Sequence, residues 1–292
     1  MKLGVVFPQT EIGTDPGAIR AFGQAVEELG FDHLIAYDHL LGADDRGPYA
    51  HRQGRPYSYR DQFLEPFLLF AHLAAVTTRL NFMTGVLVLG QRQTALVAKQ
   101  AAVLDVLTGG RLRLGVGTGW NDVEYEALGE EFRNRGARIE EQIEVLRALW
   151  TNDVVSYEGR WHKITAAGVN PLPVQRPIPI WIGGSVEAVF KRAGRIADGW
   201  IATGRFGVGE QSRGAIETVR TAASEAGRDP ASVGIEGIVN LSDLGLDAAA
   251  AAVGRLRDIG ADSASLMTMN TGLKTPDDHI EIMRRWKEGA GI

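Results

Sequence analysis

An aspartate and a histidine stand side by side at the end of a short apolar run. Asp38 and His39 follow the segment His33 to Tyr37, whose Leu, Ile and Ala residues are typical of a buried strand. Histidine can accept or donate a proton near neutral pH. We therefore take His39 as the candidate catalytic residue. The alternatives are a buried histidine satisfied by a backbone carbonyl, and an Asp38 that caps the next loop or orients His39.

Further polar and glycine residues follow other apolar runs. Gly183, Gly184 and Ser185 stand between a strand and a helix, where backbone N–H groups can hold a phosphate. A tight turn is the other use of such glycines. The remaining residues that end strands, and are candidates for the wall of a substrate pocket, are Gln9, Trp120, Thr203 and Arg205.

Three other kinds of chemistry find little support. Asp38, His39, Asp44 and His51 match no metal-site spacing, so no metal is predicted. An aldolase would need a lysine at a strand end, and no predicted strand ends on one. The absence of cysteine excludes thiol nucleophiles and disulfides.

Composition and charge point to a small-molecule substrate. The 292 residues include 36 acidic and 31 basic side chains, for a formal net charge of -5. Nucleic-acid and anionic-membrane partners usually require a basic surface. The apolar start of the chain is short and is interrupted by Pro8, which argues against a signal peptide. We therefore expect a cytoplasmic protein with no membrane partner.

The elements that must position these residues alternate along the chain. Apolar runs predict eight strands, each followed by a helical pattern, which indicates a TIM (β/α)8 barrel forming one domain over residues 1–292. The predicted strands are 3–7, 33–37, 80–89, 111–116, 178–182, 199–203, 234–241 and 263–269. The predicted helices are 16–29, 63–76, 94–107, 138–150, 186–196, 214–226, 247–259 and 276–287.

An open doubly wound sheet is the alternative architecture. The glycine run that begins at Gly115 invites a dinucleotide-binding interpretation, but Trp120 stands where the last glycine is needed. Insertions at about 41–61 and 121–164 would lie beyond the regular barrel. The first follows the second strand and predicts a lid over the mouth, and the second includes a hairpin near 153–164. Acidic and basic residues on the helix from Arg138 predict a solvated face.

Several segments, taken together and in this order, resemble the luciferase-like monooxygenase superfamily, and specifically its coenzyme F420-dependent branch. They are Tyr37-Asp38-His39, Thr84-Gly85-Val86-Leu87, Ala98 to Asp105, Arg111 to Trp120, Arg135 to Arg138, Pro179 to Gly184 and Ala197 to Trp200. The resemblance covers nearly the whole chain. The chain departs from it at Gln93-Thr94-Ala95, where many relatives have a proline, and the 41–61 insertion has no clear substrate signature.

The resemblance implies a cofactor, a site and a reaction. It places Asp38, Gly85, Val86, Thr118 and Gly119 in contact with the cofactor, with a cis peptide bond between Gly85 and Val86. It assigns the cofactor phosphate to the glycine turn described above, and it suggests a homodimer. A deazaflavin carries hydride and does not readily activate oxygen, so we expect hydride transfer to or from an alcohol, carbonyl or activated alkene. An FMN monooxygenase, or a cofactor-binding protein without catalysis, remains the alternative.

Overall fold

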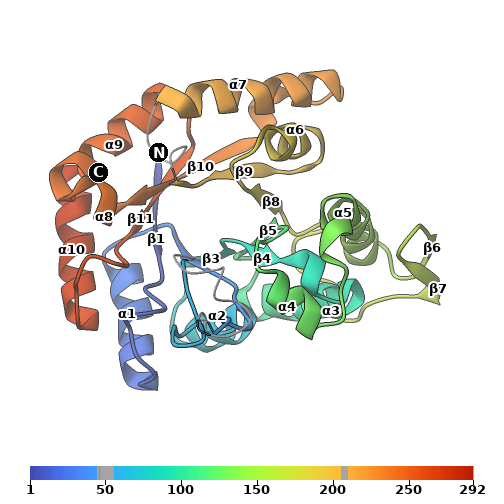
Figure 1. Ribbon diagram of the computed structural model, residues 1–292, viewed down its shortest axis with the longest axis horizontal. Coiled ribbons are helices and arrows are strands. Elements are labelled where there is room, and N and C mark those ends of the chain that lie inside the picture. The colour runs from blue at the N-terminus through green and yellow to red at the C-terminus, as the bar shows by residue number, and fades with distance from the viewer. Residues whose placement is uncertain (45, 47–55, 205–209, 292) are drawn as a thin grey trace.

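The chain forms a closed barrel of parallel strands surrounded by helices (Figure 1). The computed structural model describes all residues except 45, 47–55, 205–209 and 292. Its barrel strands are β1 (Lys2–Val6), β2 (His33–Ala36), β3 (Asn81–Thr84), β4 (Leu87–Val88), β5 (Leu112–Gly117), β8 (Ile180–Gly183), β9 (Gly199–Ala202), β10 (Gly234–Asn240) and β11 (Ser263–Met267).

The strands run around the barrel in the order β3, β2, β1, β11, β10, β9, β8, β5, and pairing of β3 with β5 closes the ring. The closed ring confirms the predicted TIM barrel and excludes the open sheet. Because every pair in the ring is parallel, the carboxyl ends of all the strands meet at one rim, as the predicted site requires.

Helices pack around the outside of this ring. They are α1 (Pro16–Glu28), α2 (Pro66–Ala74), α3 (Thr94–Thr108), α4 (Asp122–Ala127), α5 (Arg135–Thr151), α6 (Glu187–Ile196), α7 (Glu210–Glu225), α8 (Leu241–Leu244), α9 (Leu246–Asp258) and α10 (Pro276–Gly289). The α1, α2 and α10 helices begin on a proline after a side-chain cap, which fixes their first turns. Among the described residues, none of the helices is both apolar and long enough to cross a membrane.

The third barrel strand is broken, where the sequence predicts one strand over 80–89. Hydrogen bonding stops after β3, resumes in β4 and passes into a short 3₁₀ helix, η2 (Leu89–Gln91). The break contains a cis peptide bond between Gly85 and Val86, the form that the family resemblance implies. A Cβ at Gly85 would lie 2.3 Å from Cγ2 of Ile35, so only glycine fits against β2 at this bend.

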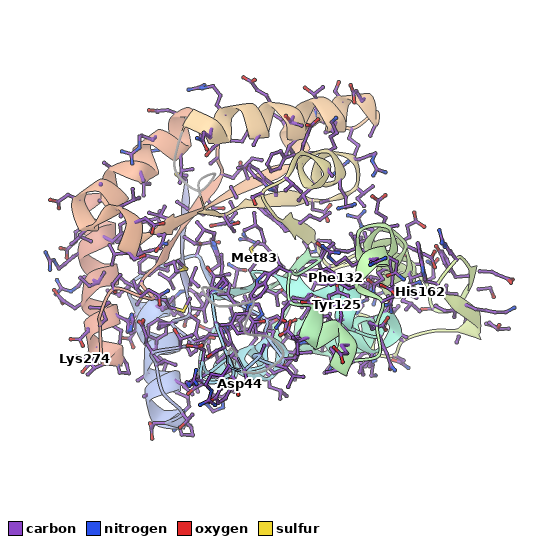
Figure 2. The ribbon with its side chains drawn as sticks, viewed as in Figure 1. Asp44, Met83, Tyr125, Phe132, His162 and Lys274 are labelled. Carbon is purple, nitrogen blue, oxygen red and sulfur yellow. The ribbon has the colours of Figure 1, made fainter. Side chains whose placement is uncertain are left out.

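Two apolar layers hold the barrel together. The larger lies between the strands and the helices, and the smaller fills the inside of the ring. Met83 lies at the centre of the molecule in Figure 2, within the inner layer. Tyr37, Val86 and Met267 are partly buried against the inner layer, and they form its boundary toward the rim.

A buried ionic cluster lies near the amino-terminal ends of β2 and β11. The imidazole of His33 stands 3.1 Å from Glu236 and 3.1 Å from Asp32. Ser265 donates to Glu236 at 2.7 Å. Gly4 makes room for this cluster, because a Cβ there would lie 2.3 Å from Nε2 of His33.

The prediction of a solvated face on α5 was wrong. Glu140 pairs with Arg192 of α6 at 2.9 Å, and Glu141 accepts three backbone N–H groups from residues 160–162. Those residues connect β6 (Val155–Glu158) to β7 (Lys163–Ala167), which form the predicted antiparallel hairpin. The charged side of α5 therefore contacts α6 and the hairpin, and is not a face exposed only to solvent.

Candidate active site

His39 lies at the rim of the barrel among aromatic rings. Its imidazole centroid is 3.9 Å from the ring of Tyr57, 4.8 Å from Phe63 and 6.2 Å from Trp120. Its side chain is 18% exposed, so the ring is shielded by its neighbours without being sealed from the rim. Trp120 therefore lies near His39, and its place in the wall of a substrate pocket stays a prediction.

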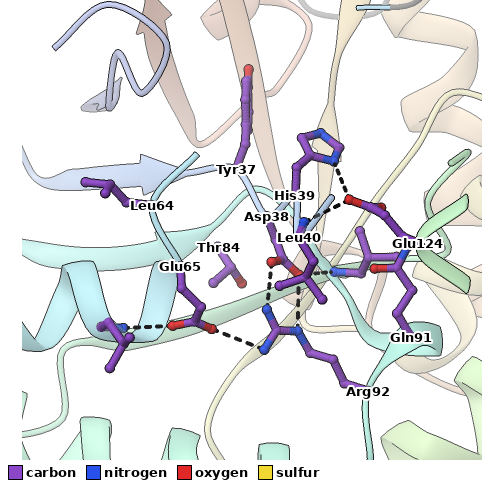
Figure 3. Close-up of polar contacts among 12 residues, drawn as sticks. Tyr37, Asp38, His39, Leu40, Leu64, Glu65, Thr84, Gln91, Arg92 and Glu124 are labelled. Atoms are coloured by element: carbon purple, nitrogen blue, oxygen red, sulfur yellow. Dashed lines mark hydrogen bonds and ion pairs between the residues drawn. The ribbon is translucent and has the colours of Figure 1, made fainter. Parts of the chain in front are cut away.

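A buried carboxylate that sequence reasoning missed lies beside His39. Glu124 of α4 points its Oε1 atom to within 3.7 Å of Nδ1 of His39 (Figure 3). The same oxygen accepts the backbone N–H groups of Leu40 at 2.8 Å and Leu41 at 3.2 Å, and the hydroxyl of Tyr57 at 3.1 Å. A single carboxylate thus ties the loop after β2, and Tyr57 of the 41–61 insertion, to α4.

The surroundings of Glu124 favour its ionised form. Burial alone would raise the pKa of this carboxyl, but contacts with His39, Gln91 and the backbone of Leu41 lower it below 4.5. The amide of Gln91 donates to Oε2 at 2.8 Å. Burial is the main reason that the pKa of Tyr57 is raised, so its hydroxyl remains a donor. The group beside His39 is therefore a carboxylate.

Asp38 is buried and already has strong partners. Its side chain accepts the backbone N–H of Val88 at 2.9 Å and pairs with Arg92 at 2.7 Å. Arg92 also pairs with Glu65, the cap of α2, at 3.1 Å (Figure 3). These contacts join Asp38 to the backbone at Val88 and to Arg92, and direct contact with a cofactor stays a prediction.

Val86 and glycines of two neighbouring barrel strands, β5 and β8, form one surface. A Cβ at Gly117 of β5 would lie 2.4 Å from Val86, and a Cβ at Gly183 of β8 would lie 2.5 Å from it. Glycine at both positions is what allows the Val86 side chain to lie between β5 and β8. Gly85, Val86 and Gly183 are each partly exposed, so this surface faces the rim.

The glycine turn before α6 joins β8 to the start of that helix. Gly184 has φ +146, a region that side chains rarely adopt, and its carbonyl accepts the indole N–H of Trp200 at 3.0 Å. Ser185 is exposed, and Val186 caps α6 without a side-chain hydrogen bond to its first N–H groups. Among the described residues, no side chain caps the backbone donors of this first turn, and phosphate binding by the turn stays a prediction.

The remaining candidate residues differ in how far they are exposed at the rim. Thr118 and Gly119 follow β5 and are partly exposed, and the Thr118 carbonyl accepts the hydroxyl of Tyr125. Gln9 is fully buried, and its amide bridges Tyr37 and Leu64, so it supports the wall instead of facing the pocket. Thr203 is partly exposed after β9.

Two residues considered in the sequence analysis cannot be placed in the site. Arg205, a candidate for the wall of the substrate pocket, lies outside the described residues. So does His51, one of the four residues considered as a metal site. Within the described part of the chain, no three His, Asp or Glu side chains gather as metal ligands.

Comparison with known proteins identifies the family. The family model for luciferase-like monooxygenases matches residues 1–259. An uncharacterised protein of Mycobacterium tuberculosis is 38% identical over 225 residues, which are 76% of this chain and 77% of that protein. An F420-dependent glucose-6-phosphate dehydrogenase of Gordonia bronchialis is 33% identical over 237 residues, covering 78% of this chain and 64% of the relative.

Solved structures share the fold at low sequence identity. An F420-dependent secondary alcohol dehydrogenase, solved with an F420–acetone adduct, has a TM-score of 0.79 at 16% identity, covering 99% of this chain and 98% of the other. The monooxygenase RslO1 of Streptomyces bottropensis has a TM-score of 0.77 at 22% identity, with coverage of 99% and 98%. With the fold, the rim site and a family match over most of its length, the chain belongs to the luciferase-like monooxygenase family of oxidoreductases.

Proposed function

We propose that this oxidoreductase uses coenzyme F420 to move a hydride to or from a small alcohol, carbonyl or activated alkene. The observation that carries the proposal is the placement of His39 at the barrel rim, beside an ionised carboxylate and among aromatic rings. A group of this kind can manage the proton that accompanies hydride transfer at an alcohol carbon.

The residues at the rim fit a flat, phosphorylated cofactor. Val86, lying between Gly117 and Gly183, offers a smooth apolar surface for a ring system. Open backbone donors at the start of α6 suit a phosphate. The buried Nδ1 of His39 has no hydrogen-bond partner among the described residues and lies 3.7 Å from Oε1 of Glu124, so this nitrogen faces the carboxylate and Nε2 is left for a substrate.

When bound, the deazaflavin supplies a carbon that accepts or donates hydride. In alcohol oxidation, Nε2 of His39 takes the hydroxyl proton while Nδ1 faces Glu124. Tyr57, Phe63 and Trp120 surround the imidazole and limit the access of water to it. In the reverse direction, the same nitrogen returns the proton to the carbonyl oxygen.

Support for the cofactor comes from the relative in Gordonia bronchialis, whose name states F420 dependence, at 33% identity. The FMN monooxygenase is the second candidate, and the monooxygenase among the structural neighbours fits it through the shared fold alone. The two differ in whether turnover consumes oxygen, which makes them separable in one assay.

The test follows the absorbance of oxidised F420 with a panel of primary and secondary alcohols, with and without oxygen. We expect reduction of the cofactor without oxygen, and a fall in kcat of about 100-fold or more for His39→Asn. His162→Asn is the matched control, because that imidazole is 13% exposed and also faces a glutamate, but lies on the hairpin side of α5 (Figure 2). Turnover only with FMN and oxygen, or full activity of His39→Asn, would overturn the proposal.

A further inference from the structure

Two buried carboxylates lie near His39, and only one of them is available to it. The side chain of Asp38, next to His39 in the chain, bonds Val88 N–H and is paired with Arg92. Glu124 comes from a separate helix, and its Oε1 atom faces the imidazole Nδ1. Glu124 is therefore the carboxylate that can stabilise a positive charge on the imidazole of His39.

The position of Glu124 is fixed by contacts that do not involve His39. Two backbone N–H groups and the Tyr57 hydroxyl converge on Oε1, and the Gln91 amide holds Oε2. Asn121, the cap of α4, donates to the Tyr57 oxygen at 2.8 Å and orders that hydroxyl. The carboxylate is thus preorganised, and the imidazole is the partner that can move toward it.

We propose that Glu124 is the positioning residue of His39: it holds Nδ1 in the protonated tautomer, leaves Nε2 for the substrate, and stabilises the imidazolium formed during turnover. This role rests on the proposed function of His39. The 3.7 Å separation is longer than a hydrogen bond, and a small rotation of the ring toward Glu124 shortens it when Nε2 takes a proton.

The groups that face His39 give the direction of the pH effect. They are Glu124 from α4, the Tyr57 hydroxyl from the lid segment, and Asp38, whose charge Arg92 offsets. Loss of the Glu124 charge would remove the partner of the imidazolium. His39 would then lose its proton at lower pH.

The first test replaces the carboxylate by the amide of the same shape. In Glu124→Gln, we expect the NMR titration midpoint of the His39 imidazole to move to lower pH, and the acid limb of kcat to move with it. We expect kcat to fall about tenfold or more while KM changes little. The NMR signal is assigned with His39→Asn, and it needs neither cofactor nor substrate.

Glu141→Gln is the matched control. Glu141 also accepts several backbone N–H groups and also faces a histidine, His162, at 2.8 Å. It should leave the His39 midpoint and kcat unchanged. A Glu124→Gln protein that loses thermal stability but keeps the wild-type His39 midpoint would show a structural role only, and would overturn the proposal.

A second variant keeps the inference testable if Glu124→Gln does not fold. Tyr57→Phe keeps the ring beside His39 and removes one donor from Oε1 of Glu124. With one hydrogen-bond donor fewer, the Glu124 carboxylate should interact more strongly with a protonated His39 and move its NMR titration midpoint to higher pH. An unchanged or lower midpoint would contradict the proposal. If F420 fails to bind the wild type, the proposed function fails, while the NMR result still decides whether Glu124 and His39 interact.

Discussion

The side chain of Val86 packs between Gly117 of β5 and Gly183 of β8. Adding a methyl group at Gly183 tests how tightly Val86 is packed there. A Cβ at Gly183 would lie 2.5 Å from Cγ1 of Val86. Carbon atoms in ordinary contact are about 3.5–4.0 Å apart, so Gly183→Ala requires a displacement of roughly 1 Å. Overpacking of this kind costs about 1–3 kcal/mol in the free energy of unfolding. It should also push Val86 toward the cofactor side and weaken binding there.

The assay is urea unfolding in a double-mutant cycle with Val86→Ala, which removes the methyl group that the new Cβ meets. Val86→Ala alone should cost about 1 kcal/mol, because the side chain is only partly buried. The double variant should be more stable than the sum of the single effects by about 1–2 kcal/mol. Effects that add to within about 0.5 kcal/mol would refute the reasoning.

Gly214→Ala on α7 is the control for the glycine substitution. A Cβ there meets nothing within 4 Å, and the residue is exposed on a helix. The same change should therefore raise the free energy of unfolding by about 0.5–1 kcal/mol. Opposite signs at Gly183 and Gly214 would tie the loss to the contact with Val86.

The remaining predictions concern the two ionic clusters. Asp38→Asn should lower the free energy of unfolding by about 3 kcal/mol, because Arg92 stays buried with a weaker partner; a loss below about 1 kcal/mol in urea would contradict this. Burial alone would lower the pKa of His33, but Glu236 and Asp32 raise it above 6.5. The stability that protonated His33 contributes is therefore complete below pH 6.5 and is lost as pH rises through the raised pKa. Burial alone would raise the pKa of Glu236, but His33 lowers it below 4.5, so that contribution is lost as pH falls. Unfolding of His33→Gln across this range should lack the alkaline loss; the same loss in the variant would contradict the assignment.

The barrel and most of its elements could be predicted from sequence because local patterns determine them. Strand runs and helical periodicity recur with little interruption, and parallel strands must place their ends at one rim. The hydrophobic pattern does not show the break at Gly85, since an apolar run continues on both sides of it; only the family resemblance implied a cis peptide bond there. A Cβ at Gly85 would overlap Ile35 of the neighbouring strand, which accounts for the glycine and which no local pattern shows.

The candidate site was predicted in part, and the missing part is long-range. His39 could be found because it ends a strand. Glu124 could not be linked to it, because the contact joins residues far apart in the chain; its bond to Leu40 spans 84 positions. The pairing of Asp38 with Arg92 spans 54 positions and was missed for the same reason. Only the structure shows that Glu124, on the short helix after β5, is buried.

The charged face of α5 illustrates the same limit. Periodicity correctly separates its apolar side from its charged side. It does not show that Arg192 and the hairpin pack against the charged side, where Glu140 and Glu141 hold them. Such partners come from other elements, so a charged stripe alone does not distinguish a solvated face from an anchoring one.

The most direct test of the central claim is a pair of binding titrations, with oxidised F420 and with FMN, followed by tryptophan fluorescence. The account predicts that F420 binds and FMN does not. It also predicts that Ser185→Glu, which puts a negative charge at the start of α6, weakens F420 binding about tenfold or more, while Ser224→Glu, exposed on α7, does not. Binding of FMN alone, of neither cofactor, or of F420 equally well by the Ser185 variant would contradict the account.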